Sequence, residues 1–110
     1  MATPLQKFKL VFFVPPSALS ACKSAIFAAG AGRYPGYTEC CFVTKGLGQF
    51  RPGSGANPNI GEVGKLEEVE EMRVETLCLG REVAGKVVEA LKEAHPYEEV
   101  AYEVYKIEDL

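Results

Sequence analysis

Tryptophan is absent from this chain of 110 residues, histidine occurs only at His95, and aspartate occurs only at Asp109. Catalytic sites usually need several positioned acid and base groups, so this shortage favours binding over catalysis. The net charge of −3 and the scattered basic residues give no electrostatic reason to expect a nucleic-acid partner. A binding module is therefore the first expectation from composition.

A long apolar run is also missing. The stretch Leu10–Val14 follows two lysines, but Pro15 and Pro16 end it. It is shorter than the ~7–15 apolar residues of a signal peptide, and nothing approaches the ~18 of a membrane span. We expect a buried strand here and no membrane association.

The four cysteines form no CxxC pair. Unpaired cysteines of this kind are typical of buried, reduced thiols in a cytoplasmic protein, and a thiolate metal site would need closer spacing. Pairing of Cys40 or Cys41 with His95 as a catalytic nucleophile has no local sequence signature. We expect structural thiols and a cytoplasmic location.

Glycine is concentrated in one stretch, Gly46–Lys65, which holds six of the 11 glycines and two of the seven prolines. Loops of this length are usually functional or disordered. Phe50, Ile60 and Val63 provide apolar anchors along it, so the composition favours a shaped loop.

Apolar periodicity predicts four strands and two helices. Ser17 is the expected cap of the first helix. Gly46 and Gly48 are predicted to form a tight turn, after which a short strand at Gln49–Arg51 pairs back. The predicted strands are Phe8–Val14, Tyr37–Thr44, Glu68–Leu79 and Val100–Ile107, and the predicted helices are Ala18–Ala29 and Glu82–Ala94.

This β-α-β-β-α-β order predicts one α+β domain over residues 1–110, a ferredoxin-like sandwich with helices on one face of an antiparallel sheet. The long Gly/Pro loop connects the two central strands. Val11, Phe13, Tyr105 and Ile107 make the second sheet face too apolar for water. We therefore expect a homo-oligomer.

Two long segments resemble a known family: GRYPGYTECCFVTKGLGQFRPGSGANPNIGEVGKLEEVEEMRVE and EAHPYEEVAYEVY. They are similar to the inserted domain of the YqfO-type, Nif-three-like proteins, which resembles the CutA and PII trimer-forming fold. The resemblance implies a stand-alone CutA/PII-like module, with a trimer favoured. The family's dinuclear metal centre lies in flanking domains, and His95 alone cannot assemble one. The GTP cyclohydrolase label of the full-length family is therefore not carried over.

The glycine-rich stretch lacks both G-x-x-x-x-G-K-[ST] and G-x-G-x-x-G. Backbone nests can bind anions without these signatures. A small anionic ligand is one hypothesis, with a structural or oligomer-contacting loop as the alternative. The candidate ligand-binding residues are Arg33, Lys45, Arg51, Asn57 and Asn59.

His95, Glu98 and Glu99 bring an imidazole and two carboxylates within five residues. Such groups can bind a divalent metal, either Zn or Cu. Alternatively, His95 ends a helix and the glutamates pair with basic side chains.

The combined prediction is a small oligomeric binding or regulatory module. It binds a small ligand, a metal ion or a protein partner at subunit clefts. The alternative is a hydrolase-like enzyme with a metal- or His-dependent site assembled across subunits.

Overall fold

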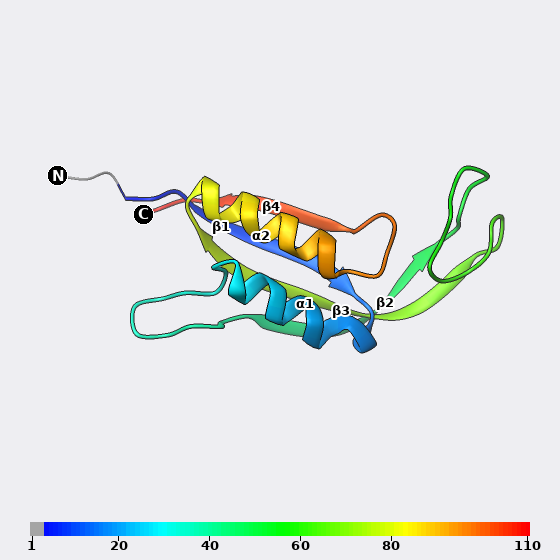
Figure 1. Ribbon diagram of the computed structural model, residues 1–110, viewed down its shortest axis with the longest axis horizontal. Helices are drawn as coiled ribbons and strands as arrows, with labels where there is room; N and C mark the ends of the chain where they lie inside the picture. Colours follow the sequence, from blue (N-terminus) through cyan, green and yellow to red (C-terminus); the bar gives the residue numbers. More distant parts are fainter. Residues whose placement is uncertain (1–3) are drawn as a thin grey trace.

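The structure is a computed structural model that describes residues 4–110, and it consists of one antiparallel sheet with two helices on one face (Figure 1). Neighbouring strands pair antiparallel in the order β2-β3-β1-β4. The predicted β-α-β-β-α-β order is confirmed. The elements are β1 (Lys7–Val14), α1 (Pro16–Ala28), β2 (Phe42–Phe50), β3 (Glu67–Leu79), α2 (Arg81–Ala94) and β4 (Tyr102–Ile107).

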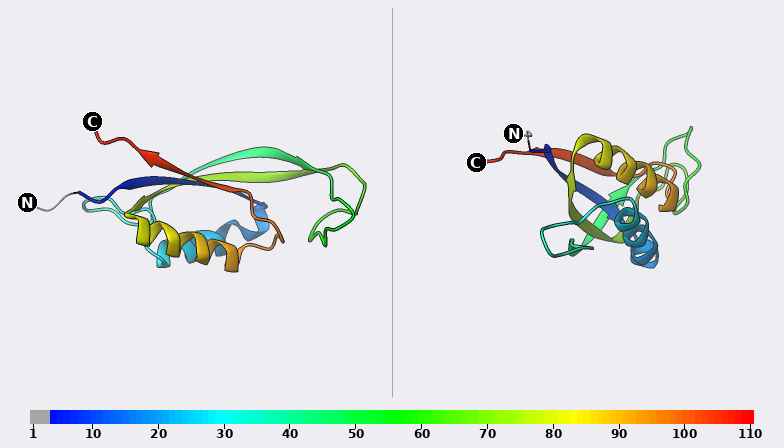
Figure 2. Two further views of the ribbon diagram at one scale, coloured as in Figure 1. Left: turned by 90° about the horizontal axis from the view of Figure 1, so that it is seen from above. Right: turned by 60° about the vertical axis from the view of Figure 1, so that its left-hand side comes forward.

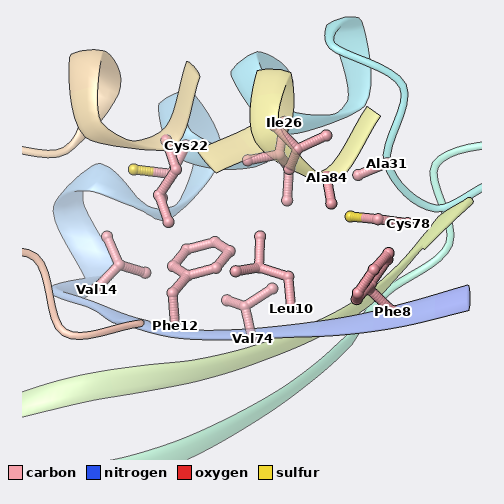
Figure 3. Packing of buried hydrophobic residues seen from close by; sticks show 12 residues of the cluster. Phe8, Leu10, Phe12, Val14, Cys22, Ile26, Ala31, Val74, Cys78 and Ala84 are labelled. Atoms are coloured by element: carbon pink, nitrogen blue, oxygen red, sulfur yellow. The ribbon is translucent and has the colours of Figure 1, made fainter. Parts of the chain in front are cut away.

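The core lies between β1 and the two helices, as Figure 3 shows. Alternate residues of β1, including Leu10 and Phe12, point toward the helices, where Cys22 and Ile26 of α1 meet them. Phe12 and Ile26 are fully buried, and burial of such a side chain stabilises the fold by about 1.5–3 kcal/mol. The buried strand expected here is confirmed, and it lies inside the sheet between β3 and β4.

The second strand differs from its prediction. It begins at Phe42 and continues to Phe50, so Gly46 and Gly48 lie inside β2 and form no turn. The reason is β3, which is 13 residues long and offers paired backbone along its whole length, from Glu75 opposite Phe42 to Glu67 opposite Phe50. This continuous pairing overrides the low strand propensity of glycine. Of the short strand predicted at Gln49–Arg51, the first two residues form the end of β2 and Arg51 lies just beyond it.

The first helix also begins differently from the prediction. Pro15 occupies the N-cap position and Pro16 the first turn, without a side-chain cap from Ser17. Proline suits the first helical turn because its fixed φ is helical and it has no N–H to leave unbonded. The Ala18 N–H instead donates to the Pro15 carbonyl at 3.0 Å.

The outer parts of β2 and β3 project beyond the rest of the sheet as a two-stranded ribbon (Figure 2). β1 ends at Val14, opposite Met72, whereas β3 extends back to Glu67. The molecule is consequently elongated, with extents of 56 × 24 × 23 Å. The predicted long loop connects β2 and β3 at the tip of this ribbon.

The sheet face opposite the helices is uncovered (Figure 2) and carries large apolar side chains. Phe42 is 66% exposed and Tyr105 is 50% exposed. The Arg73 guanidinium lies 5.7 Å from the centre of the Phe13 ring and covers part of it. No helix within residues 4–110 is long and apolar enough to cross a membrane.

Candidate ligand cavity

Residues 51–66, here called the glycine loop, are closed on themselves. The Gly64 N–H donates to the Pro52 carbonyl at 2.8 Å, and the Arg51 guanidinium donates to the Gly64 carbonyl at 2.9 Å. Gly64 has a φ of 81°, in the left-handed region that favours glycine. The backbone is therefore tied across the base of the loop, which is the shaped loop that the sequence predicts.

The expected anchors of this loop are only partly correct. Phe50 and Ile60 are partly buried, as predicted. Val63 is 50% exposed and does not anchor the loop. Pro52 is buried as well, although it was not among the predicted anchors. The apolar contact is therefore concentrated at the base and middle of the loop.

A second segment, residues 95–101, connects α2 to β4 and is fixed to the end of β1. His95 is 6% exposed, and its Nδ1 accepts the Tyr97 N–H at 3.1 Å. Nε2 therefore carries the ring proton and donates to the Phe13 carbonyl at 2.7 Å. At the other end of the segment, the Phe13 N–H donates to the Ala101 carbonyl at 3.1 Å. The imidazole thus joins the 95–101 segment to the end of β1 through its two hydrogen bonds.

The environment of His95 favours its neutral form. Burial lowers the pKa of the imidazole below its ordinary value of 6.5, and the hydrogen bond to the Phe13 carbonyl opposes that shift in part. A second proton on the ring would remove the acceptor that holds the Tyr97 N–H. In this conformation of residues 95–101, the neutral imidazole therefore uses one ring nitrogen as a donor and the other as an acceptor.

The glycine loop, the ribbon and residues 97–101 enclose a cavity of about 280 Å³. The loop and the segment are joined at its edge, where the Asn57 N–H donates to Oε2 of Glu98 at 2.8 Å. The lining residues come from all three parts of the chain. They are Gln49, Phe50, Pro52, Ala56, Pro58, Asn59, Ile60, Glu71, Tyr97, Glu98, Glu99 and Ala101.

Tyr97 is the most unusual lining residue. Its hydroxyl is buried and has no hydrogen-bond partner within residues 4–110. Burial, and secondly the charge of Glu71, raise the pKa of Tyr97, so the phenol remains protonated. Burial also raises the pKa of Glu71. A buried polar group without a partner costs about 1–3 kcal/mol, which a bound ligand or water can recover.

The candidate anion-binding residues are not gathered at one place. Asn59 lines the cavity and Asn57 bonds to its edge through the backbone. The Arg51 guanidinium donates a hydrogen bond within the glycine loop. Lys45 pairs with Glu70 at 3.2 Å on the surface. Arg33 belongs to the connection between α1 and β2, at the opposite end of the molecule (Figure 1).

The candidate metal ligands lie in the 95–101 segment, but two of them, His95 and Glu98, have other partners. Both nitrogens of His95 are hydrogen bonded, and Glu98 accepts from Asn57. Within the part of the chain that the structure describes, no group of three or more His, Cys, Asp or Glu residues could hold a metal ion. A metal at His95 would have to displace one of its two hydrogen bonds, and this site stays a prediction.

The cysteines have structural positions. All four are free, and Cys22 and Cys78 are buried. Burial raises the pKa of both buried thiols, that of Cys78 to about 11, which suppresses the reactive thiolate.

No family model matches the chain. The chain is 44% identical over 100 residues to the GTP cyclohydrolase 1 type 2 homolog of Bacillus subtilis. That alignment covers 91% of this chain and 26% of the relative. A Bacillus cereus protein related to NIF3 has a similar structure, with a TM-score of 0.84 and 38% identity over 98% of this chain and 27% of that chain. The chain thus spans about a quarter of the length of these relatives.

Two further structures share the fold at low sequence identity. The periplasmic divalent cation tolerance protein CutA of Archaeoglobus fulgidus has a TM-score of 0.65 at 13% identity, over 94% of this chain and 85% of that one. The B. subtilis GlnK–ATP complex has a TM-score of 0.60 at 14% identity, over 94% of this chain and 84% of that one. The chain is therefore similar to one segment of the Nif-three-like proteins, and it has the CutA/PII-like fold.

Proposed function

We propose that this chain is an oligomeric binding module, a single CutA/PII-like domain over residues 1–110, that holds a small ligand in the cavity beneath the glycine loop. One observation carries the proposal: the glycine loop and residues 97–101 surround a cavity of about 280 Å³, with largely apolar walls and with Tyr97 among the lining residues. The Asn57–Glu98 hydrogen bond joins the glycine loop to residues 95–101, and these two segments form opposite parts of the cavity lining.

The uncovered sheet face supports self-association. Phe42 and Tyr105 expose apolar surface there, and burial of such surface against a second copy is favourable. The strands at both edges, β2 and β4, also have unpaired backbone groups. We favour a homotrimer because the sequence resembles the inserted domain of the Nif-three-like proteins, which is similar to the trimer-forming CutA and PII fold. The four free cysteines support a cytoplasmic location.

Ligand binding can be tested with 2-phenylethanol, a neutral probe with a ring and a hydroxyl group. Its titration should shift the backbone amide resonances of Ile60 and Tyr97 in the nuclear magnetic resonance spectrum. Ala101→Leu, which reduces the cavity, should abolish these shifts. Ala28→Leu adds the same atoms on the exposed surface of α1 and should leave them unchanged. Shifts confined to other regions, or equal shifts in both variants, would contradict the proposal.

The metal-dependent alternative makes a different prediction. If Zn²⁺ or Cu²⁺ binds at His95, Glu98 and Glu99, then calorimetry should show about one site per chain, and Glu99→Gln should weaken it. Glu99 is exposed, so this change does not disturb the core. Equal metal binding by Glu99→Gln and by the exposed control Glu93→Gln would exclude this site and any hydrolase-like chemistry that depends on it.

A further inference from the structure

The charge of the cavity is opposite to that expected for an anion site. Three carboxylates line it, those of Glu71, Glu98 and Glu99, and none of the lining residues is Lys, Arg or His. An anion placed there would be repelled by all three, whereas a cation would be attracted. The anion hypothesis drew on basic residues that surround the loop in sequence, and the fold does not bring them to the cavity lining.

The lysine side chains in and near the glycine loop form ion pairs with carboxylates outside the cavity lining. Lys65 pairs with Glu62 at 2.8 Å. Lys45 pairs with Glu70 on the face of the ribbon opposite to that of Glu71. Within residues 4–110, no ion pair involves a carboxylate that lines the cavity. The negative charge of the lining is therefore not neutralised by the described part of the chain.

The rest of the lining suits an organic molecule. Phe50, Pro52, Pro58 and Ile60 form apolar walls, and the amides of Gln49 and Asn59 add polar groups. A metal ion does not fit this arrangement, because no three candidate ligands in the described residues lie close enough to hold one. The volume of about 280 Å³ lies near the lower end of ligand pockets, roughly 300–1,000 Å³, so the ligand is small.

On the basis of the proposed function, we propose that the ligand is a small organic amine, with an apolar body between Phe50 and Ile60 and a protonated nitrogen facing Glu71. An ammonium group has three donors and no acceptor. The carboxylate of Glu71 would accept one of its hydrogen bonds, and the other lining carboxylates, those of Glu98 and Glu99, would add attraction for its positive charge.

The test compares three probes that share a phenyl ring and differ in charge: 2-phenylethylamine, 2-phenylethanol and 3-phenylpropionate. Affinity is measured from the amide shifts of Ile60 and Tyr97 at low salt. The amine should bind about fivefold more tightly than the alcohol, and the carboxylate more weakly than both. Added salt should reduce the advantage of the amine, because it screens partly exposed charges.

Two variants assign the preference to one carboxylate. Glu71→Gln should remove most of the advantage of the amine over the alcohol. Glu70→Gln removes the same charge from the neighbouring position, on the other face of β3, and should leave the advantage unchanged. If the alcohol binds in the cavity and the amine binds no more tightly, the amine proposal is wrong and the proposed function stands. If no probe shifts the cavity amides, both are wrong.

Discussion

The side chain of Glu71 fills the space that a Cβ atom would occupy at Gly48. Gly46 and Gly48 lie on the same face of β2, and Glu71 is paired with Gly46 across the ribbon. The absence of a side chain at Gly48 lets the Glu71 carboxylate lie across the strand beside the cavity that it lines. Gly48 thus positions a candidate binding group, whereas the sequence assigned it to a turn.

Gly48→Ala should change ligand binding more than stability. The new methyl group would displace Glu71, but the displaced atoms are the end of a flexible side chain, and alanine suits a strand better than glycine. We expect the free energy of unfolding to change by less than about 0.5 kcal/mol. Affinity for 2-phenylethylamine should fall severalfold. In the control Gly46→Ala the nearest atom, the Glu71 carbonyl oxygen, lies 3.9 Å away, and binding should be retained.

The stability of the protein should decrease in mild acid because of His95. Its folded-state pKa lies below the ordinary value of 6.5, so as pH falls the unfolded chain takes up a proton first. The stability that comes from keeping His95 neutral in the folded state is fully present above about pH 6.5. It is lost as pH falls from there toward the lower folded-state pKa. Denaturant unfolding at several pH values measures this directly.

His95→Gln is the control for this pH dependence. Its amide can still donate to the Phe13 carbonyl, but it does not titrate, and His95 is the only histidine in the chain. The decrease just below pH 6.5 should be smaller in this variant. An equally steep decrease would assign the effect to other groups.

Hydrogen exchange should divide the glycine loop into slow and fast amides. The amides of Asn57 and Gly64 donate to Glu98 and to Pro52 and should exchange slowly, whereas the exposed Gly55 should exchange quickly. Phe50→Ala should speed exchange at the two slow positions by about tenfold, because the loop loses an apolar anchor. Val63→Ala, a change at a half-exposed position, should have little effect. Fast exchange at Asn57 and Gly64 in the unchanged protein would indicate a disordered tether.

Self-association should depend on the uncovered sheet face. Light scattering at micromolar concentration should give three times the chain mass of 11.9 kDa. Phe42→Glu should lower this mass, since a buried unpaired charge is costly. Leu110→Glu, at an exposed position outside the sheet, should not. A monomer at all concentrations would contradict the oligomer.

The sequence predicted the elements with strong periodicity and missed those that depend on distant pairing. The apolar residues on both faces of Phe8–Val14 correctly indicated a buried strand, and β1 lies inside the sheet, between β3 and β4. The extent of β2 could not be read locally, because its glycines are held in the strand by pairing with the long β3. Pro15 and Pro16 follow the end of the first strand at Val14, as predicted, and Pro16 is also the first residue of α1, two residues before the predicted start.

The candidate site was predicted only in outline. The sequence indicated the glycine loop and the residues from His95 to Glu99, and the structure brings these two regions together at Asn57 and Glu98. Glu71 and Tyr97 were missed as lining residues. Glu71 belonged to an acidic run that resembled a solvated strand face, and its place at the cavity depends on the pairing register of the ribbon. A buried hydroxyl without a partner, as at Tyr97, has no sequence signature.

The central claim, that the cavity beneath the glycine loop binds a small ligand, is tested most directly by nuclear Overhauser effects between bound 2-phenylethylamine and the protein. The account predicts that the ring protons of the probe show contacts with the side chains of Phe50 and Ile60, and that its methylene protons show contacts with Tyr97. Contacts confined to other surfaces, such as α1 or the uncovered sheet face, would contradict the claim, as would the absence of any contact at saturating probe.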